Sequence, residues 1–180
     1  RDSLLDAHQQ ALDCGDMEWG AYALAAYIQY AFPLCQNLDQ LQPKLEKDTR
    51  LLRQYGQKQS LQYSLFILQT MENMRGQNND PTRLDGRFYR EDRDLAELTR
   101  ENHRTAICLH HFYKALLSFI FGDMEAAYHH SEISLELRDS ISGTFTVLWI
   151  MMINALSIIQ LLPSTSILTQ PARLKTVRKA

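Results

Sequence analysis

The chain has 180 residues, a length that fits one domain, since a single core usually serves roughly 100–200 residues. Hydrophobic residues make up 45% and charged residues 22%, close to the averages of folded globular proteins, which argues against a disordered or fibrous chain. Nineteen basic and twenty-one acidic side chains give a net charge of −2, and the two signs are interspersed. Without a basic patch, nucleic acid is not expected as a partner.

Three cysteines, Cys14, Cys35 and Cys108, lie far apart and show no CxxC spacing. An odd number of scattered cysteines is typical of free thiols in a reducing compartment, so we predict a cytoplasmic protein. The chain starts at Arg1 without a signal-peptide pattern and stops at Ala180 within a basic run. We therefore expect it to be a segment of a longer protein.

Glycines and prolines divide the sequence into stretches of about 15–20 residues, and each stretch has apolar residues at spacings of three and four. This pattern predicts an all-α protein of about seven or eight helices. The predicted helices cover residues 4–12, 16–32, 38–55, 58–75, 92–100, 102–121, 124–137 and 145–162. Residues 77–90, rich in Asn, Asp, Pro and Gly, are predicted to form an irregular loop with Leu84, Phe88 and Tyr89 as apolar anchors.

The sequence Gly-Asp-Met-Glu occurs twice, at 15–18 and at 122–125, each time between two predicted helices. Glycine can take the left-handed conformation that ends the first helix, and aspartate can cap the second. The repeat predicts antiparallel helical hairpins stacked in one helical-repeat domain over residues 1–163. Residues 164–180 are predicted to begin a further helix.

Residues 145–162 form the most hydrophobic predicted helix, and no charged residue occurs between Asp139 and Arg173. A membrane span needs about 20 mainly apolar residues, and the basic residues downstream would suit its cytoplasmic end. However, Thr146, Asn154 and Ser157 share one face of this helix. We favour a buried helix, with a membrane span as the alternative.

The sequence lacks the motifs of nucleophile elbows, phosphate-binding loops, dinucleotide-binding loops, zinc proteases and kinase catalytic loops, so we predict no catalytic residue in this segment. Histidines occur in the adjacent pairs His110-His111 and His129-His130. Neighbours on a helix point about 100° apart, and no histidine pair has the i, i+3 or i, i+4 spacing of helical zinc ligands. Neither a metal site nor another cofactor is therefore expected here.

Surface aromatic and arginine residues are the best candidates for partner binding, because these types are enriched in protein interfaces. The candidates are Tyr22, Tyr30, Arg87, Phe88, Tyr89 and Arg90. For each tyrosine the alternative is packing between helices with its hydroxyl at the edge, and Phe88 could instead fasten the loop down.

The stretch Gly-Asp-Met-Glu-Trp at 15–19, followed by Ala21-Tyr22 and a Tyr-rich helix, resembles the helical region of large multi-sensor hybrid Ser/Thr and histidine kinases. Residues 79–91 and 102–123 are similar to further parts of that region, so the resemblance covers about residues 7–163. Gly20 departs from the helix-favouring small residue expected there. Residues 164–180 show little of the family.

In that family the region follows a kinase-like domain and an AAA-type ATPase domain, and it precedes GAF and histidine-kinase domains. The resemblance implies a tetratricopeptide-like α-solenoid without catalytic residues, which couples the neighbouring domains of a signalling protein or binds protein or peptide partners. It also implies that ATP binds in those neighbouring domains. The alternatives are a membrane-anchored helical protein using residues 145–162 as its span and a free-standing helical peptide-binding protein.

Overall fold

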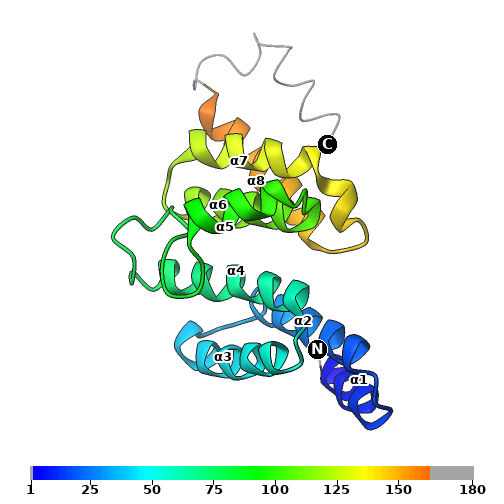
Figure 1. The fold of residues 1–180 in the computed structure, drawn as a ribbon. Coiled ribbons are helices and arrows are strands. Elements are labelled where there is room, and N and C mark those ends of the chain that lie inside the picture. The colour runs from blue at the N-terminus through cyan, green and yellow to red at the C-terminus, as the bar shows by residue number, and fades with distance from the viewer. Residues whose placement is uncertain (1, 163–180) are drawn as a thin grey trace. The chain divides into compact units, whose positions relative to one another are not determined.

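The computed structural model describes residues 2–162, and over that range it is all-α (Figure 1). The helices are α1 (Asp2–Asp13), α2 (Met17–Ala31), α3 (Leu38–Gln54), α4 (Lys58–Met74), α5 (Glu91–Arg100), α6 (Arg104–Ile120), α7 (Met124–Glu136), the short 3-10 helix η1 (Arg138–Ile141) and α8 (Thr146–Leu161). The predicted helices are thus confirmed close to their expected ends. The further helix predicted at 164–180 lies outside the described residues.

The chain divides into two compact units, each of which is described by itself. Within the described residues, unit 1 comprises residues 2–79 and 84–90 and contains α1 to α4 with most of the long loop. Unit 2 comprises residues 80–83 and 91–162 and contains α5 to α8. The loop predicted at 77–90 is therefore shared between the two units.

The repeated Gly-Asp turn closes a helical hairpin in each unit. In unit 1, Gly15 has a φ of +76° and the Asp16 carboxylate accepts a hydrogen bond from the Trp19 N–H at 3.1 Å. In unit 2, Gly122 has a φ of +87° and Asp123 accepts from the Ala126 N–H at 3.0 Å. In each hairpin the two helices pack against each other, α1 on α2 and α6 on α7. The predicted hairpin turns are confirmed at both places.

Replacing Asp123 with alanine should lower the free energy of unfolding by about 1 kcal/mol, the usual cost of losing an N-cap. The carboxylate satisfies a backbone N–H that is otherwise free in the first turn of α7. Urea unfolding of the variant measures the loss. Glu136→Ala removes the same charge from the exposed C-terminal end of α7 and is the matched control; equal losses in the two variants would rule out the cap as the cause.

Helix α8 buries three of its four polar side chains and exposes a row of aliphatic ones. Thr146, Asn154 and Ser157 are buried, and the Asn154 amide donates hydrogen bonds to Ser131 Oγ at 3.0 Å and Glu132 Oε1 at 2.7 Å on α7. The exposed aliphatic residues are Leu148, Met152, Leu156 and Ile159. The shared polar face is confirmed, and it points into unit 2. Among the described helices, none is both long and apolar enough to cross a membrane.

Candidate functional site

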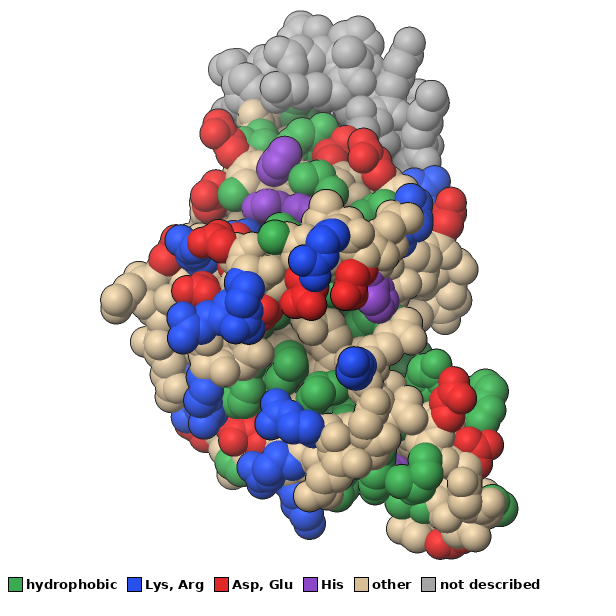
Figure 2. All heavy atoms as spheres, in the orientation of Figure 1, with side chains coloured by type: hydrophobic (Ala, Val, Ile, Leu, Met, Phe, Trp, Pro, Cys, Tyr) green, Lys and Arg blue, Asp and Glu red, His purple; other side chains and the backbone are tan. Residues whose placement is uncertain are grey.

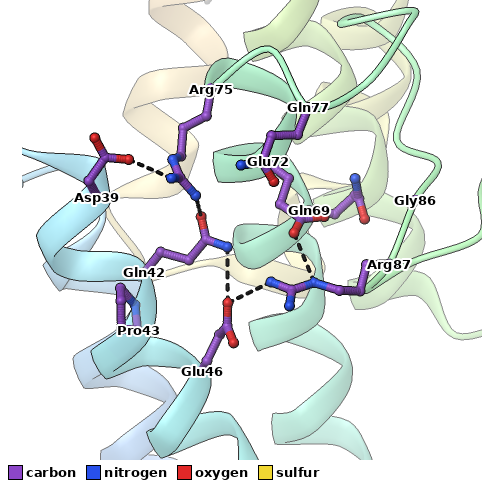
Figure 3. A pocket seen from close by; sticks show the side chains of 10 residues that line it. All are labelled: Asp39, Gln42, Pro43, Glu46, Gln69, Glu72, Arg75, Gln77, Gly86 and Arg87. Carbon is purple, nitrogen blue, oxygen red and sulfur yellow. Dashed lines mark hydrogen bonds and ion pairs between the residues drawn. The ribbon is translucent and has the colours of Figure 1, made fainter.

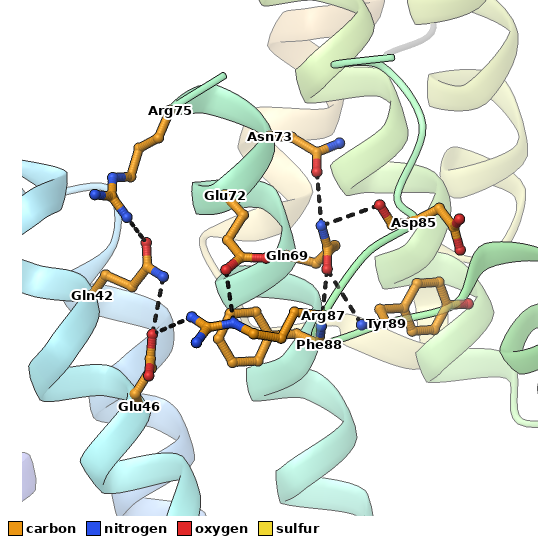
Figure 4. Close-up of polar contacts among 10 residues, drawn as sticks. All are labelled: Gln42, Glu46, Gln69, Glu72, Asn73, Arg75, Asp85, Arg87, Phe88 and Tyr89. Atoms are coloured by element: carbon orange, nitrogen blue, oxygen red, sulfur yellow. Dashed lines mark hydrogen bonds and ion pairs between the residues drawn. The ribbon is translucent and has the colours of Figure 1, made fainter. Parts of the chain in front are cut away.

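The second half of the long loop is fastened to α4 by a buried glutamine. Gln69 is 1% exposed, and its Oε1 accepts hydrogen bonds from the backbone N–H of Phe88 at 3.1 Å and of Tyr89 at 3.4 Å (Figure 4). Its Nε2 donates to Asn73 Oδ1 at 2.9 Å. A Cβ at Gly86 would lie 2.5 Å from the same Nε2. One side chain thus fixes the path of residues 84–90 and leaves room only for glycine at 86.

Apolar anchors hold the same part of the loop. Leu84 is fully buried, and the Tyr89 ring packs edge-on against Phe66 of α4 with centroids 4.9 Å apart. The Asn78 amide donates to the Asp85 carbonyl at 2.6 Å. Polar and apolar contacts therefore both hold residues 84–90 in place within unit 1.

A polar pocket of about 570 Å³ lies between α3, α4 and this loop (Figure 3). Its lining residues are Asp39, Gln42, Pro43, Glu46, Gln69, Glu72, Arg75, Gln77, Gly86 and Arg87. Helix α3 supplies the first four, α4 supplies Gln69 and Glu72, and the remainder come from the end of α4 and the loop. This pocket is the candidate functional site of unit 1.

Two arginines connect the walls of the pocket through a continuous series of contacts. Arg75 pairs with Asp39 at 2.6 Å and donates to Gln42 Oε1 at 2.7 Å. The Gln42 amide in turn donates to Glu46 Oε1 at 3.0 Å. Arg87 completes the series, as its guanidinium pairs with Glu46 at 2.6 Å (Figure 4).

Arg87 also reaches the nearly buried carboxylate of Glu72, with Nε 2.9 Å from Oε1. The pocket therefore holds two guanidinium groups, of Arg75 and Arg87, against three carboxylates, of Asp39, Glu46 and Glu72. Its formal charge is −1, so it favours a cationic or neutral polar group over an anion. An anion would first have to displace a carboxylate from its guanidinium.

The loop residues predicted to bind a partner have different environments. Arg87 is exposed but held in ion pairs, with its guanidinium 4.3 Å above the Phe88 ring, and Phe88 is half-buried. Arg90 is exposed. Tyr89 is only 1% exposed, which corrects its assignment to a surface patch: its ring is used to anchor the loop against Phe66.

The two tyrosines predicted on α2 are on the surface, and the structure adds a tryptophan beside them. Tyr22 is 39% and Tyr30 36% exposed, while Trp19 is 67% exposed with its ring 5.8 Å from that of Tyr22. Positions 19, 22, 26 and 30 follow the spacing of one helix face. That spacing is visible in the sequence, so Trp19 could have been included among the candidates.

Unit 2 brings together histidines that the sequence separates. His111 of α6 and His130 of α7 meet with their Nδ1 atoms 3.1 Å apart, and histidine side chains gather on the surface over these helices (Figure 2). His110 is buried beside them. Burial lowers the pKa of His110 to about 2 and the pKa values of His111 and His130 to about 4 each. Within residues 2–162, no group of three potential metal-ligating side chains was found.

These lowered pKa values predict that acid destabilises unit 2. A histidine with a folded-state pKa below its unfolded value of about 6.5 binds protons preferentially in the unfolded state, so stability is lost as the pH falls from about 6.5 toward 4. For the buried His110, this linkage amounts to about 2 kcal/mol at pH 5. Urea unfolding at pH 7 and pH 5 tests the effect; His110→Gln should reduce the difference between the two pH values, and an unchanged difference would contradict the assignment.

Comparison with known proteins identifies no relative: no protein family, no curated protein and no solved structure matches the chain. Over the described residues, the fold and the site thus define an all-α protein with an open polar pocket between α3 and α4 and an exposed aromatic face on α2.

Proposed function

We propose that the chain is a non-catalytic helical segment that couples domains by protein–protein contact within a multidomain signal-transduction kinase. The proposal includes the stacking of the hairpins as a tetratricopeptide-like α-solenoid, a cytoplasmic location and ATP binding by neighbouring domains. Neighbouring domains of the same polypeptide are the expected partners, in keeping with the resemblance described above.

The observation that carries the proposal is the aromatic face of α2, formed by Trp19, Tyr22 and Tyr30. A tryptophan 67% exposed on a well-formed helix leaves a large apolar surface in water, at a position where a polar residue would serve the hairpin equally well. Trp and Tyr are also the residue types most enriched among energetically dominant interface residues. Ala23 and Ala26 lie between these rings and keep the face shallow enough for a second element to pack closely.

The aliphatic row on α8 supports the same class of function in unit 2. Its residues 148, 152, 156 and 159 follow helical spacing, and no charged residue interrupts the helix. A helix that is apolar nearly all round is normally covered on every side by protein. Both units therefore present apolar helix faces of the kind used in interdomain contacts.

Photo-crosslinking in the full-length protein tests the proposal. A photoreactive benzoylphenylalanine at Trp19 should form cross-links to another domain of the same polypeptide, identified by mass spectrometry of the digested protein. The same residue at Gln10, which is exposed on α1, is the matched control. Equal yields at the two positions would contradict the proposal, and cross-links from position 19 only to separate proteins would favour a free-standing peptide-binding protein.

A further inference from the structure

Hairpin packing brings His111 and His130 together. The proposed coupling function does not use this pair. The two residues lie on opposite helices of the hairpin formed by α6 and α7. Their ring centroids are 5.2 Å apart, the rings are inclined by only 25°, and the Nδ1 atoms face each other at 3.1 Å. The spacing rule for ligands within one helix does not apply to a pair that forms across two helices.

The Nδ1 atoms of the two rings share a hydrogen bond, so one ring carries its hydrogen on Nδ1. When an ion binds, that hydrogen moves to Nε2 of the same ring, which leaves both Nδ1 lone pairs for the metal. Both side chains are partly exposed, so an ion can reach them from solvent. The other groups that face the pair are His110, His129, Lys114 and Asp123. The positive charge of Lys114, which would repel a cation, is paired with Glu91, whose Oε1 lies 2.9 Å from the Lys114 Nζ.

The distance between the two nitrogens suits a shared ion. Zinc binds histidine nitrogen at about 2.0–2.1 Å, so two ligands of a tetrahedral ion lie roughly 3.3 Å apart. The observed separation of 3.1 Å is close to that value. Binding requires both rings to turn until their Nδ1 lone pairs point to the same ion.

We infer that His111 and His130 bind one borderline transition-metal ion, with Zn²⁺ as the expected type, and thereby cross-link α6 and α7. Imidazole nitrogen suits Zn²⁺, Cu²⁺ and Ni²⁺ and does not suit Mg²⁺ or Ca²⁺, which prefer oxygen ligands. The two histidines provide two ligands, and water or a partner's side chain would complete the coordination. An ion held only by the folded hairpin stabilises it in proportion to occupancy.

Thermal unfolding with added ZnCl₂ at pH 7 tests the inference, with MgCl₂ at the same concentration as the control for ionic strength. Zn²⁺ should raise the Tm by a few degrees and Mg²⁺ should not. His111→Gln and His130→Gln should each abolish the zinc-dependent rise, while His129→Gln, at the exposed neighbouring position, should retain it. Each variant is compared with itself without zinc, so a change in its basal stability does not affect the result.

A titration at 25 °C against a chromophoric zinc chelator provides a second readout that does not depend on unfolding. The wild-type chain should compete for one equivalent of Zn²⁺ more strongly than either His111→Gln or His130→Gln. The absence of a zinc effect in the wild type, or the same effect in these two variants, would overturn the inference, since the ion would then not bind or would bind elsewhere.

Discussion

Replacing Tyr89 with alanine is expected to lower the free energy of unfolding by about 3–5 kcal/mol, the range for removing a large aromatic side chain from a core. The ring is buried and packs edge-on against Phe66, so its removal leaves a cavity between α4 and the loop and also loses an aromatic pair. Leu84 would then be the remaining fully buried side chain of residues 84–90. Urea unfolding followed by circular dichroism measures the loss.

Tyr22→Ala is the matched control, because it removes the same side chain from the exposed face of α2. It should cost less than about 1 kcal/mol, as surface substitutions usually do. Under the proposed function, Tyr22→Ala should weaken interdomain cross-linking more than Tyr89→Ala does. If Tyr89→Ala costs no more stability than Tyr22→Ala, the Tyr89 ring does not anchor the loop.

Gly86→Ala is expected to lower the free energy of unfolding by about 1–3 kcal/mol, the usual cost of overpacking. The added Cβ would lie 2.5 Å from Nε2 and 2.9 Å from Oε1 of Gln69. A glutamine side chain can often move aside, but this one is buried and accepts hydrogen bonds from the backbone N–H groups of Phe88 and Tyr89. Moving it would leave those groups without an acceptor, which is the costly outcome.

A double-mutant cycle with Gln69→Ala isolates the contact. If the methyl group added by Gly86→Ala clashes with the Gln69 amide, the double variant should lose little more free energy of unfolding than Gln69→Ala alone, since the amide is already absent. Urea unfolding of the four proteins measures the coupling. Additive losses would show that the cost of Gly86→Ala arises elsewhere in the loop.

Local signals in the sequence are sufficient to predict the helices. Helix periodicity and the glycine and aspartate of each turn depend on residues within one or two turns of each other. The two Gly-Asp turns at 15–16 and 122–123 behave alike for this reason. Leu84 and Tyr89 were likewise recognisable as apolar anchors within a polar loop.

Contacts between distant segments could not be predicted in the same way. Arg87 reaches Glu46 across 41 positions, and His111 reaches His130 across 19. Composition marks arginine and histidine as surface residues, and only the packing of helices decides whether they find partners. The sequence assigned Tyr89 both to the loop anchors and to the partner-binding candidates, and only the packing, which buries it, decides between the two.

Helix α8 shows how an overall property can mislead. Its apolar composition fits either a membrane span or a buried helix, and in the structure Asn154 is buried against α7 while an aliphatic row is exposed. Hydropathy alone does not indicate which face of such a helix meets its neighbours, because nearly every face is apolar.

The most direct test of domain coupling is the sequence of the gene on both sides of this segment. The proposal predicts an upstream nucleotide-binding motif of the GxxxxGK[ST] type and downstream GAF and histidine-kinase domains in the same reading frame. A start codon immediately before Arg1 and a stop codon immediately after Ala180 would contradict it, and the chain would then be a free-standing helical binding protein.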